Sequence, residues 1–171
     1  SSDHLVEAWS RTFGIKSLIT NCSNNFGPRQ FTEKLIPKVI LNALNLKKIP
    51  IYGSGKNIRD WLYVKDHINA IFALYEHDVF GSGERFNIGG GFEVSNIEIV
   101  SSILSILSKK YHLKEANSLI QNVEDRLGHD FRYAINNSKI CSTTSWKPSS
   151  NFKEDLDQTI SWYIENSNWW E

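Results

Sequence analysis

The sequence predicts an α/β fold, because segments with helical periodicity alternate along the chain with short apolar segments rich in β-branched residues. Its 171 residues are enough for one compact domain with a substantial core. No internal repeat or low-complexity segment interrupts the alternation. We therefore expect strands joined by helices, and not a helical bundle or a repeat protein.

The first part of the chain predicts a helix, a strand and a second helix. An amphipathic helix occupies the start of the sequence and should end near Gly14, because glycine is common just past helix C-termini. Residues 17–20 are β-prone, and as a parallel strand they should deliver a polar functional loop at residues 21–30. The second helix should begin near Leu35, which places Pro37 in its first turn.

The middle of the chain predicts two strands, a helix and a further strand. Residues 49–52 and 58–63 are strand-like and are joined by a turn at residues 53–56. Apolar residues recur at helical spacing through residues 64–75 and indicate the next helix. Residues 85–88 form the last of these strands, which three consecutive glycines close.

The last part of the chain is expected to be mainly helical. Ser95 and Glu98 match a capping box, and the helix that they open should turn an apolar face inward. Two shorter helices are expected, one near residues 138–143 and one opened by Asn151. Residues 109–121 are polar and aperiodic, which predicts a mobile loop.

Composition excludes several classes of partner. The 19 basic and 19 acidic residues cancel, so no global charge draws the chain to nucleic acid or to an anionic membrane. No apolar run approaches the roughly 18 residues that a membrane span needs. Cys22 and Cys141 lack metal-type spacing, as do the five histidines, so we expect no metal and reduced thiols in a cytoplasmic protein.

Two glycine-rich segments fail as nucleotide-binding motifs. The Gly-Lys pair at residues 55–56 lacks the other residues of a phosphate-binding loop, since Pro50 and Asn57 occupy the positions that would carry Gly and Ser or Thr. The three glycines at residues 89–91 lack the spacing of a dinucleotide fingerprint, which favours a tight turn. We therefore expect that the NAD-binding half of a Rossmann fold is absent from this chain.

Two positively charged positions stand out. Arg59 lies in an otherwise apolar strand, where an unpaired guanidinium is costly, so it should bind an anion, either a ligand or a carboxylate such as that of Asp60. Arg126 belongs to a charged cluster that is either a solvated surface turn or part of a site. For Tyr52 the choice is between core packing and contact with a flat ligand.

Several separated motifs together resemble one family. They are Asn-Asn-Phe-Gly-Pro at residues 24–28, Glu-Lys-Leu-Ile-Pro at 33–37, Arg-Asp-Trp-Leu-Tyr-Val at 59–64 and Asp-Arg-Leu-Gly-His at 125–129. With the opening Ser-Ser-Asp-His-Leu, they resemble the dTDP-glucose 4,6-dehydratases, which are extended short-chain dehydrogenases. Leu127 departs from the pattern, because the family has Pro there, and this loosens the expected loop.

The resemblance implies a role for each matching residue. Arg59 and Arg126 would bind the phosphates of a dTDP-sugar, Pro50 and Tyr52 would hold the thymine, and Asn25 would contact the nicotinamide end of NAD. Asn96 would contact the nucleotide portion, unless it is only a first-turn helix residue. The implied substrate-binding residues are Asn24, Lys34, Leu35, Pro50, Tyr52, Arg59, Asn96, Asp125, Arg126 and His129.

The resemblance also implies what the whole enzyme does. NAD would take a hydride from C4 of dTDP-glucose, water would be lost across C5 and C6, and the hydride would return to C6, giving the 4-keto-6-deoxy sugar. The family's catalytic Tyr, Lys, Asp and Glu would all precede residue 1, so no catalytic residue is assigned here. Residues 1–171 would be the carboxyl-terminal portion, in which the last elements of the Rossmann sheet interleave with a small α/β sugar-nucleotide domain.

The resemblance also implies how the protein assembles, and alternative functions remain to be distinguished from the one it implies. The first helix would continue the family's catalytic helix, which packs against its twin in a homodimer. One alternative is another nucleotide-sugar 4,6-dehydratase or a 4-epimerase. A different class of function is a stand-alone, non-catalytic module that binds a sugar nucleotide or dimerises. The mass of the native gene product distinguishes these, at about 40 kDa for the enzyme and about 20 kDa for the module.

Overall fold

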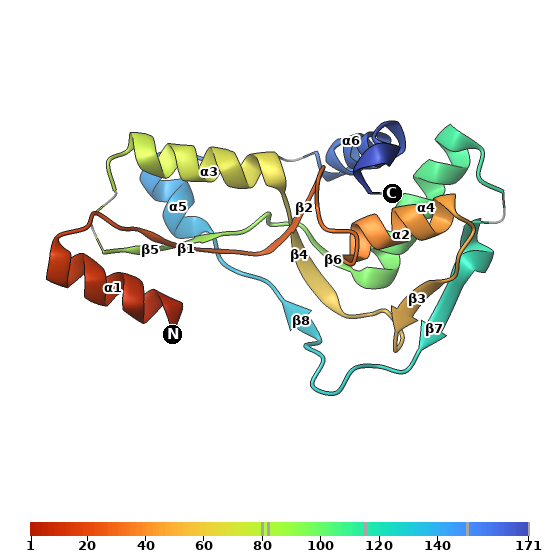
Figure 1. Ribbon diagram of the computed structural model, residues 1–171, viewed down its shortest axis with the longest axis horizontal. Helices are drawn as coiled ribbons and strands as arrows, with labels where there is room; N and C mark the ends of the chain where they lie inside the picture. The colour runs from red at the N-terminus through yellow and green to blue at the C-terminus, as the bar shows by residue number, and fades with distance from the viewer. Residues whose placement is uncertain (80, 82, 115, 150, 171) are drawn as a thin grey trace.

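A computed structural model describes residues 1–79, 81, 83–114, 116–149 and 151–170. It is a mixed α/β structure with helices on both sides of short strands (Figure 1). In chain order the elements are α1 (Ser2–Phe13), β1 (Ile19–Cys22), β2 (Asn24–Phe26), α2 (Leu35–Leu44), β3 (Ile49–Tyr52), β4 (Ile58–Tyr63), α3 (Val64–Glu76), β5 (Arg85–Ile88), β6 (Glu93–Ser95), α4 (Asn96–Tyr111), the 3-10 helix η1 (Ala116–Leu119), β7 (Ile120–Val123), β8 (Arg132–Tyr133), α5 (Ser138–Thr144), α6 (Phe152–Glu165) and η2 (Ser167–Trp169).

One end of the molecule is built on the parallel pair β1 and β5, in which Ile19 lies opposite Arg85. Helix α1 lies on one face of this pair, and α3 and α5 lie on the other (Figure 1). The core between the strands and the α3–α5 layer is apolar and fully enclosed. Its buried residues are Leu62, Ala70, Leu74, Phe86, Ile88, Ile140 and Trp146.

The other end is built on the parallel pair β3 and β7, with α2, α4 and α6 grouped beside it (Figure 1). Strand β4 connects the two ends. Its last three residues pair with β2, and its first residues pair with β6 and β8. Because β4 is held on both sides, the side chains of its central residues occupy fixed positions.

Helix α4 forms where the capping box predicts it. The Ser95 hydroxyl accepts a hydrogen bond from the Glu98 backbone N–H, and the Glu98 carboxylate accepts one from the Ser95 backbone N–H. These bonds satisfy donors that the first helical turn would otherwise leave unpaired. The expected inner face is confirmed, with Ile99, Val100, Ile103, Leu104 and Leu107 all buried.

The other predicted helices and most strands are also confirmed. Helix α1 ends at Phe13, and Gly14 adopts a left-handed conformation with φ of 66° as its C-terminal cap. Helix α2 begins at Leu35, so Pro37 lies in the first turn, where its missing N–H costs no hydrogen bond. Helix α6 begins just after Asn151 and buries Phe152, Leu156, Ile160 and Tyr163.

Two strand predictions need correction. The segment expected at residues 17–20 is shifted, because β1 begins only at Ile19, where its register with β5 starts. Residues 21–30 are only partly a loop, since β4 provides backbone partners that make Asn24–Phe26 a strand. The predicted turn between β3 and β4 at residues 53–56 is confirmed, and these two strands pair with other strands.

The expectation of a mobile loop at residues 109–121 is wrong for most of that segment. Helix α4 continues to Tyr111, and the Lys110 ammonium lies 2.8 Å from a carboxylate oxygen of Asp157 on α6. A 3-10 helix and strand β7 follow. The strand has little β-propensity of its own and forms because β3 lies beside it.

Helix α3 faces the core with a different side from the one that its apolar pattern indicates. Ala70 and Leu74 are its buried residues. The larger apolar side chains Ile68, Phe72 and Tyr75 lie on the exposed side, and that of Phe72 is 60% exposed. Periodicity alone could not choose between two apolar faces, and close packing on the strands favours the smaller side chains.

Within the part of the chain that the structure describes, no helix has the length and apolarity needed to cross a membrane. Cys22 and Cys141 are both free. Among the described residues, His, Cys, Asp and Glu form no cluster suited to a metal ion.

Candidate functional site

A cavity of about 370 Å³ lies between the start of α2, strands β3 and β4 and the loop after β7. This volume falls in the usual range for small-molecule sites, roughly 300 to 1,000 Å³. Both polar and apolar side chains contribute to its wall. The lining residues are Asn24, Glu33, Lys34, Leu35, Lys38, Pro50, Ile51, Tyr52, Arg59, Trp61, Asn96, Arg126 and His129.

The fold brings residues together here that are far apart in sequence. Pro50 and Tyr52 are two positions apart on β3, so their side chains share a face of the strand, and the same holds for Arg59 and Trp61 on β4. Asn24 arrives on β2, which pairs in parallel with β4. Nine of the ten predicted substrate-binding residues therefore line one cavity.

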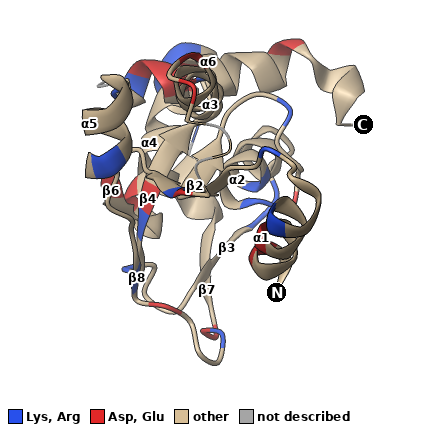
Figure 2. Cartoon of the chain, turned by 90° about the vertical axis from the view of Figure 1, so that its left-hand side faces the viewer, with Lys and Arg blue, Asp and Glu red and all other residues tan. Residues whose placement is uncertain are grey.

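The cavity is locally basic although the whole chain is neutral. Lys34, Lys38, Arg59 and Arg126 line it, against the single carboxylate of Glu33. Elsewhere, Lys and Arg positions are interspersed with Asp and Glu positions along the ribbon (Figure 2). An anionic ligand is therefore attracted by this site and not by a general surface field.

Arg59 is half-buried, and its guanidinium donates a hydrogen bond of 2.7 Å to the backbone carbonyl of Ile58. Among the described residues no carboxylate forms an ion pair with it, so the alternative of a salt bridge with Asp60 is not realised. Asp60 is buried and accepts a hydrogen bond from the Phe92 N–H. The remaining donors of Arg59 are available to an anion in the cavity.

Arg126 and His129 form an ordered group with Asp125. His129 Nδ1 lies 2.6 Å from Asp125 Oδ1, and His129 Nε2 lies 2.9 Å from an Arg126 guanidinium nitrogen. This guanidinium is 4.9 Å from the centre of the Tyr52 ring. The hydrogen bond from His129 holds the pKa of the Asp125 carboxyl below its ordinary value. The His129 side chain is only 5% exposed, so the alternative of a wholly solvated surface turn is wrong for this residue.

Two of the predicted site residues do not line the cavity. Asp125 does not line the cavity itself, but it forms a hydrogen bond with His129, which does. Asn25 donates from its amide nitrogen to the Ser23 carbonyl, and its amide oxygen lies 2.9 Å from His67 Nδ1. Burial lowers the pKa of His67 below its ordinary value, which favours the neutral imidazole beside Asn25.

Four lining residues were not predicted from the sequence: Glu33, Lys38, Ile51 and Trp61. Lys38 follows Lys34 by one helical turn, so its place on the same face of α2 could have been found from helical spacing. Trp61 could have been found from its position two residues after Arg59 on the same strand. Glu33 begins the Glu-Lys-Leu-Ile-Pro motif, which could have indicated it, whereas Ile51 gives no comparable signal.

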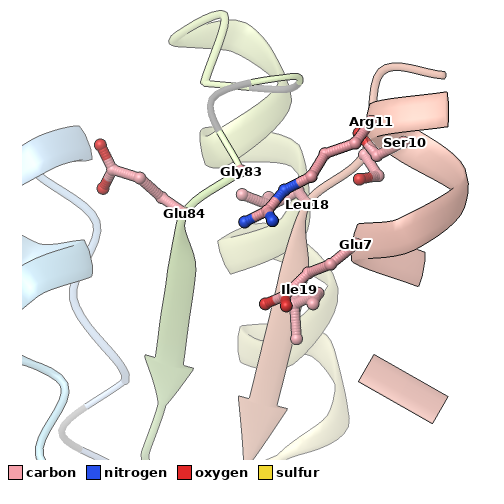
Figure 3. Close-up of a pocket in the computed structure, with 8 residues that line it drawn as sticks. Glu7, Ser10, Arg11, Leu18, Ile19, Gly83 and Glu84 are labelled. Carbon is pink, nitrogen blue, oxygen red and sulfur yellow. The ribbon is translucent and has the colours of Figure 1, made fainter. Parts of the chain in front are cut away.

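A second cavity, of about 80 Å³, lies between α1 and the beginnings of β1 and β5 (Figure 3). The Arg11 side chain extends into it from α1, and Glu7 lines it from the same helix (Figure 3). The Glu7 carboxylate is already paired with the Arg85 guanidinium, which lowers its pKa. This space is too small for a nucleotide.

Comparison with known proteins identifies the family of this chain. A family model described as GDP-mannose 4,6 dehydratase matches residues 1–159 of this chain. The chain belongs to this family. Its α/β fold class, expected from the sequence, is thereby confirmed as part of the Rossmann-type fold of extended short-chain dehydrogenases.

Relatives within the GDP-mannose 4,6 dehydratase family include curated dTDP-glucose 4,6-dehydratases. One from Escherichia coli is 48% identical over 176 residues, and the match covers all of this chain and 48% of the relative. One from Neisseria meningitidis is 47% identical, with 49% of its length covered. The chain thus spans about half the length of the curated relatives that it matches.

Solved structures with a similar fold include two dTDP-glucose 4,6-dehydratases. DesIV, a dTDP-glucose 4,6-dehydratase from Streptomyces venezuelae solved with NAD and TYD bound, is 38% identical with a TM-score of 0.88 over 99% of this chain and 50% of its own. The Bacillus anthracis dTDP-glucose 4,6-dehydratase in complex with NAD is 42% identical, with a TM-score of 0.84 over 99% of this chain and 51% of its own. A UDP-glucose 4-epimerase from Thermotoga maritima, at 22% identity, shares the fold alone.

Proposed function

We propose that this chain is the sugar-nucleotide-binding portion of an NAD-dependent dTDP-glucose 4,6-dehydratase. The observation that carries the proposal is the basic cavity, which four cationic side chains line together with the exposed Tyr52 ring. Identity of 48% to a curated enzyme of that activity supports the choice of substrate. In this proposal residues 1–171 have two parts. One is the end of the molecule built on β1 and β5, and the other is the end built on β3 and β7, which bears most of the cavity.

The proposed ligand would be held by two kinds of contact. The Tyr52 ring offers a flat surface to the thymine base, with Pro50 beside it on the same strand. The Arg59 guanidinium and the Lys34 ammonium would bind the pyrophosphate, close to the N-terminus of α2, where backbone N–H groups favour an anion. Asn24 and Asn96 would add hydrogen bonds from opposite sides.

We do not expect the described residues by themselves to form a dinucleotide site. Asn25 is the residue proposed to reach NAD, and its amide retains one N–H and one lone pair beyond its bonds to Ser23 and His67. A glycine-rich phosphate loop is absent from the sequence. NAD would accept a hydride from the sugar and later return it, and the role proposed for this chain is to bind and orient the sugar nucleotide.

The proposal is tested by calorimetry with the purified 171-residue chain. It should bind dTDP, and it should bind dTDP more tightly than UDP or GDP at the same ionic strength. Equal binding of all three diphosphates would favour the alternative of a different nucleotide-sugar dehydratase or epimerase. Failure to bind any of them would overturn the assignment of the cavity.

Tyr52→Ala is expected to weaken dTDP binding by about 1 to 3 kcal/mol, because it removes a stacking surface for the base. The loss for glucose 1-phosphate, which has no base, should be smaller. Tyr52→Phe keeps the ring and serves as the matched control, with affinity close to that of the unmodified chain. Equal losses for both ligands in calorimetry would assign Tyr52 to structural packing instead.

Residues 1–171 alone are expected to show no measurable binding of NAD. The reason is that a dinucleotide is normally held by a glycine-rich turn at the start of a Rossmann fold, which this sequence does not contain. Fluorescence or calorimetric titration of the chain with NAD measures this directly. Micromolar affinity would show that a dinucleotide site exists among these residues.

We also propose that the protein is a cytosolic homodimer that associates through α1. None of the residues of α1 is buried, and its Leu5, Trp9 and Phe13 side chains are exposed. The Trp9 and Phe13 rings pack on each other, with centroids 5.0 Å apart. A helix face of this kind is a candidate for association.

Trp9→Glu is expected to shift the chain toward monomer, because it places a charge in the middle of the exposed apolar face of α1. The oligomeric state is measured by light scattering across a range of concentrations. Phe72→Glu, on the exposed side of α3, is the matched control that should leave association unchanged if α1 is responsible. A stable monomer of the unmodified chain at high concentration would contradict the homodimer.

A further inference from the structure

The contacts of His129 give its two ring nitrogens different hydrogen-bonding roles. Arg126 can only donate hydrogen bonds, so the His129 Nε2 that lies 2.9 Å from it must accept. His129 Nδ1, which lies 2.6 Å from Asp125 Oδ1, must then carry the proton and donate it to the carboxylate. This arrangement places the ring proton on Nδ1. A second proton, on Nε2, would point an N–H at a guanidinium.

The backbone around this group holds Asp125 in place. Asp125 Oδ1 also accepts a hydrogen bond of 2.9 Å from the Arg126 backbone N–H. Across the β3–β7 pair, the Gly53 N–H donates to the Val123 carbonyl, and the Asn122 amide donates to the Gly53 carbonyl. A Cβ on Gly53 would lie 2.8 Å from Asp125 Oδ2, so the carboxylate depends on a glycine at that position.

From these contacts we propose that His129 is a positioning residue, which links Asp125 to Arg126 and holds the Arg126 guanidinium over the Tyr52 ring at the rim of the cavity. The inference rests on the proposed function and deepens it, because it assigns His129 an indirect role in binding a nucleoside diphosphate. Asp125 orients the imidazole, and the imidazole offers its lone pair to Arg126. The long, flexible arginine side chain is thereby ordered before the ligand arrives, which reduces the entropy lost on binding.

The role can be tested without any ligand. In the unmodified chain, the ¹⁵N chemical shifts of the His129 ring at neutral pH should report a protonated Nδ1 and an unprotonated Nε2. Asp125→Ala should remove this tautomeric preference. A His129 ring with its proton on Nε2, or one unaffected by Asp125→Ala, would overturn the proposal.

A double-mutant cycle tests the functional consequence. His129→Ala should weaken dTDP binding about tenfold, the scale of losing one charge-assisted hydrogen bond. In a chain that already carries Arg126→Ala, the same change should cost less than about twofold, because the residue on which His129 acts is gone. An undiminished loss in the Arg126→Ala background would mean that His129 contacts the ligand directly or is only structural.

His129→Gln is the conservative control, because its side-chain oxygen can accept from Arg126 in place of Nε2. It should recover most of the affinity that His129→Ala loses, and failure to do so would count against the proposal. The proposed function fails separately: if the unmodified chain does not bind dTDP, the cavity is misassigned, whereas the ring tautomer still decides the arrangement of His129.

Discussion

Replacing Arg59 by Ala is expected to weaken dTDP binding by about 2 to 4 kcal/mol, the scale for removing one partner of a charge-assisted contact inside a site. Arg59 is half-buried in the cavity wall, and its guanidinium has no carboxylate partner among the described residues. We expect the pyrophosphate of the ligand to supply the anion that compensates it. Calorimetry with dTDP gives the loss, and inorganic pyrophosphate should show a similar one.

Arg132→Ala is the matched control for loss of an arginine from the same chain. Arg132 lies on β8, where its guanidinium is exposed and forms two hydrogen bonds with the Glu93 carboxylate. Its removal should leave dTDP affinity nearly unchanged. Arg59→Lys should recover part of the loss, because it restores the charge without the two-pronged geometry. An Arg59→Ala chain with full affinity for dTDP would remove Arg59 from the site.

Local signals predicted the helices best. Helix α4 is an example. Its capping box, formed by Ser95 and Glu98, and the apolar residues of its inner face all lie within a short stretch of sequence, and the structure confirms the helix that they predict. Strands β6 and β8 are only three and two residues long and went unpredicted. They are strands because β4 lies beside them, and no local pattern records that neighbour.

For the site, too, some features follow from local sequence and others depend on the fold. The need of Arg59 for an anion follows from its apolar surroundings in the sequence alone, and the structure shows that Asp60 does not supply it. The proximity of Arg126 to Tyr52 depends on the parallel pairing of β3 with β7, which joins distant segments. Only the resemblance to a family indicated that these two residues belong together. Lys38 does not figure in that resemblance, but its helical spacing from Lys34 places it on the same face of α2.

Gly90 is the position at which the structure tolerates a side chain least. A Cβ there would lie 1.8 Å from the backbone oxygen of Trp61 and 2.6 Å from its carbonyl carbon. Both are atoms of β4, which is paired on either side and cannot move without disrupting its neighbours. The segment that contains Gly90 is also tied to this strand, because the Trp61 N–H donates to the Phe92 carbonyl.

Gly90→Ala is therefore expected to lower the free energy of unfolding by about 3 kcal/mol or more, measured by chemical denaturation. Gly91→Ala is the matched control: its φ of 68° is unfavourable for alanine, but no atom lies within 4 Å of the added Cβ, so its cost should be only about 1 to 2 kcal/mol. Because Trp61 lies on the same strand face as Arg59, any folded Gly90→Ala chain should also bind dTDP more weakly. A Gly90→Ala chain as stable as the Gly91→Ala control would contradict the close approach of this glycine to β4.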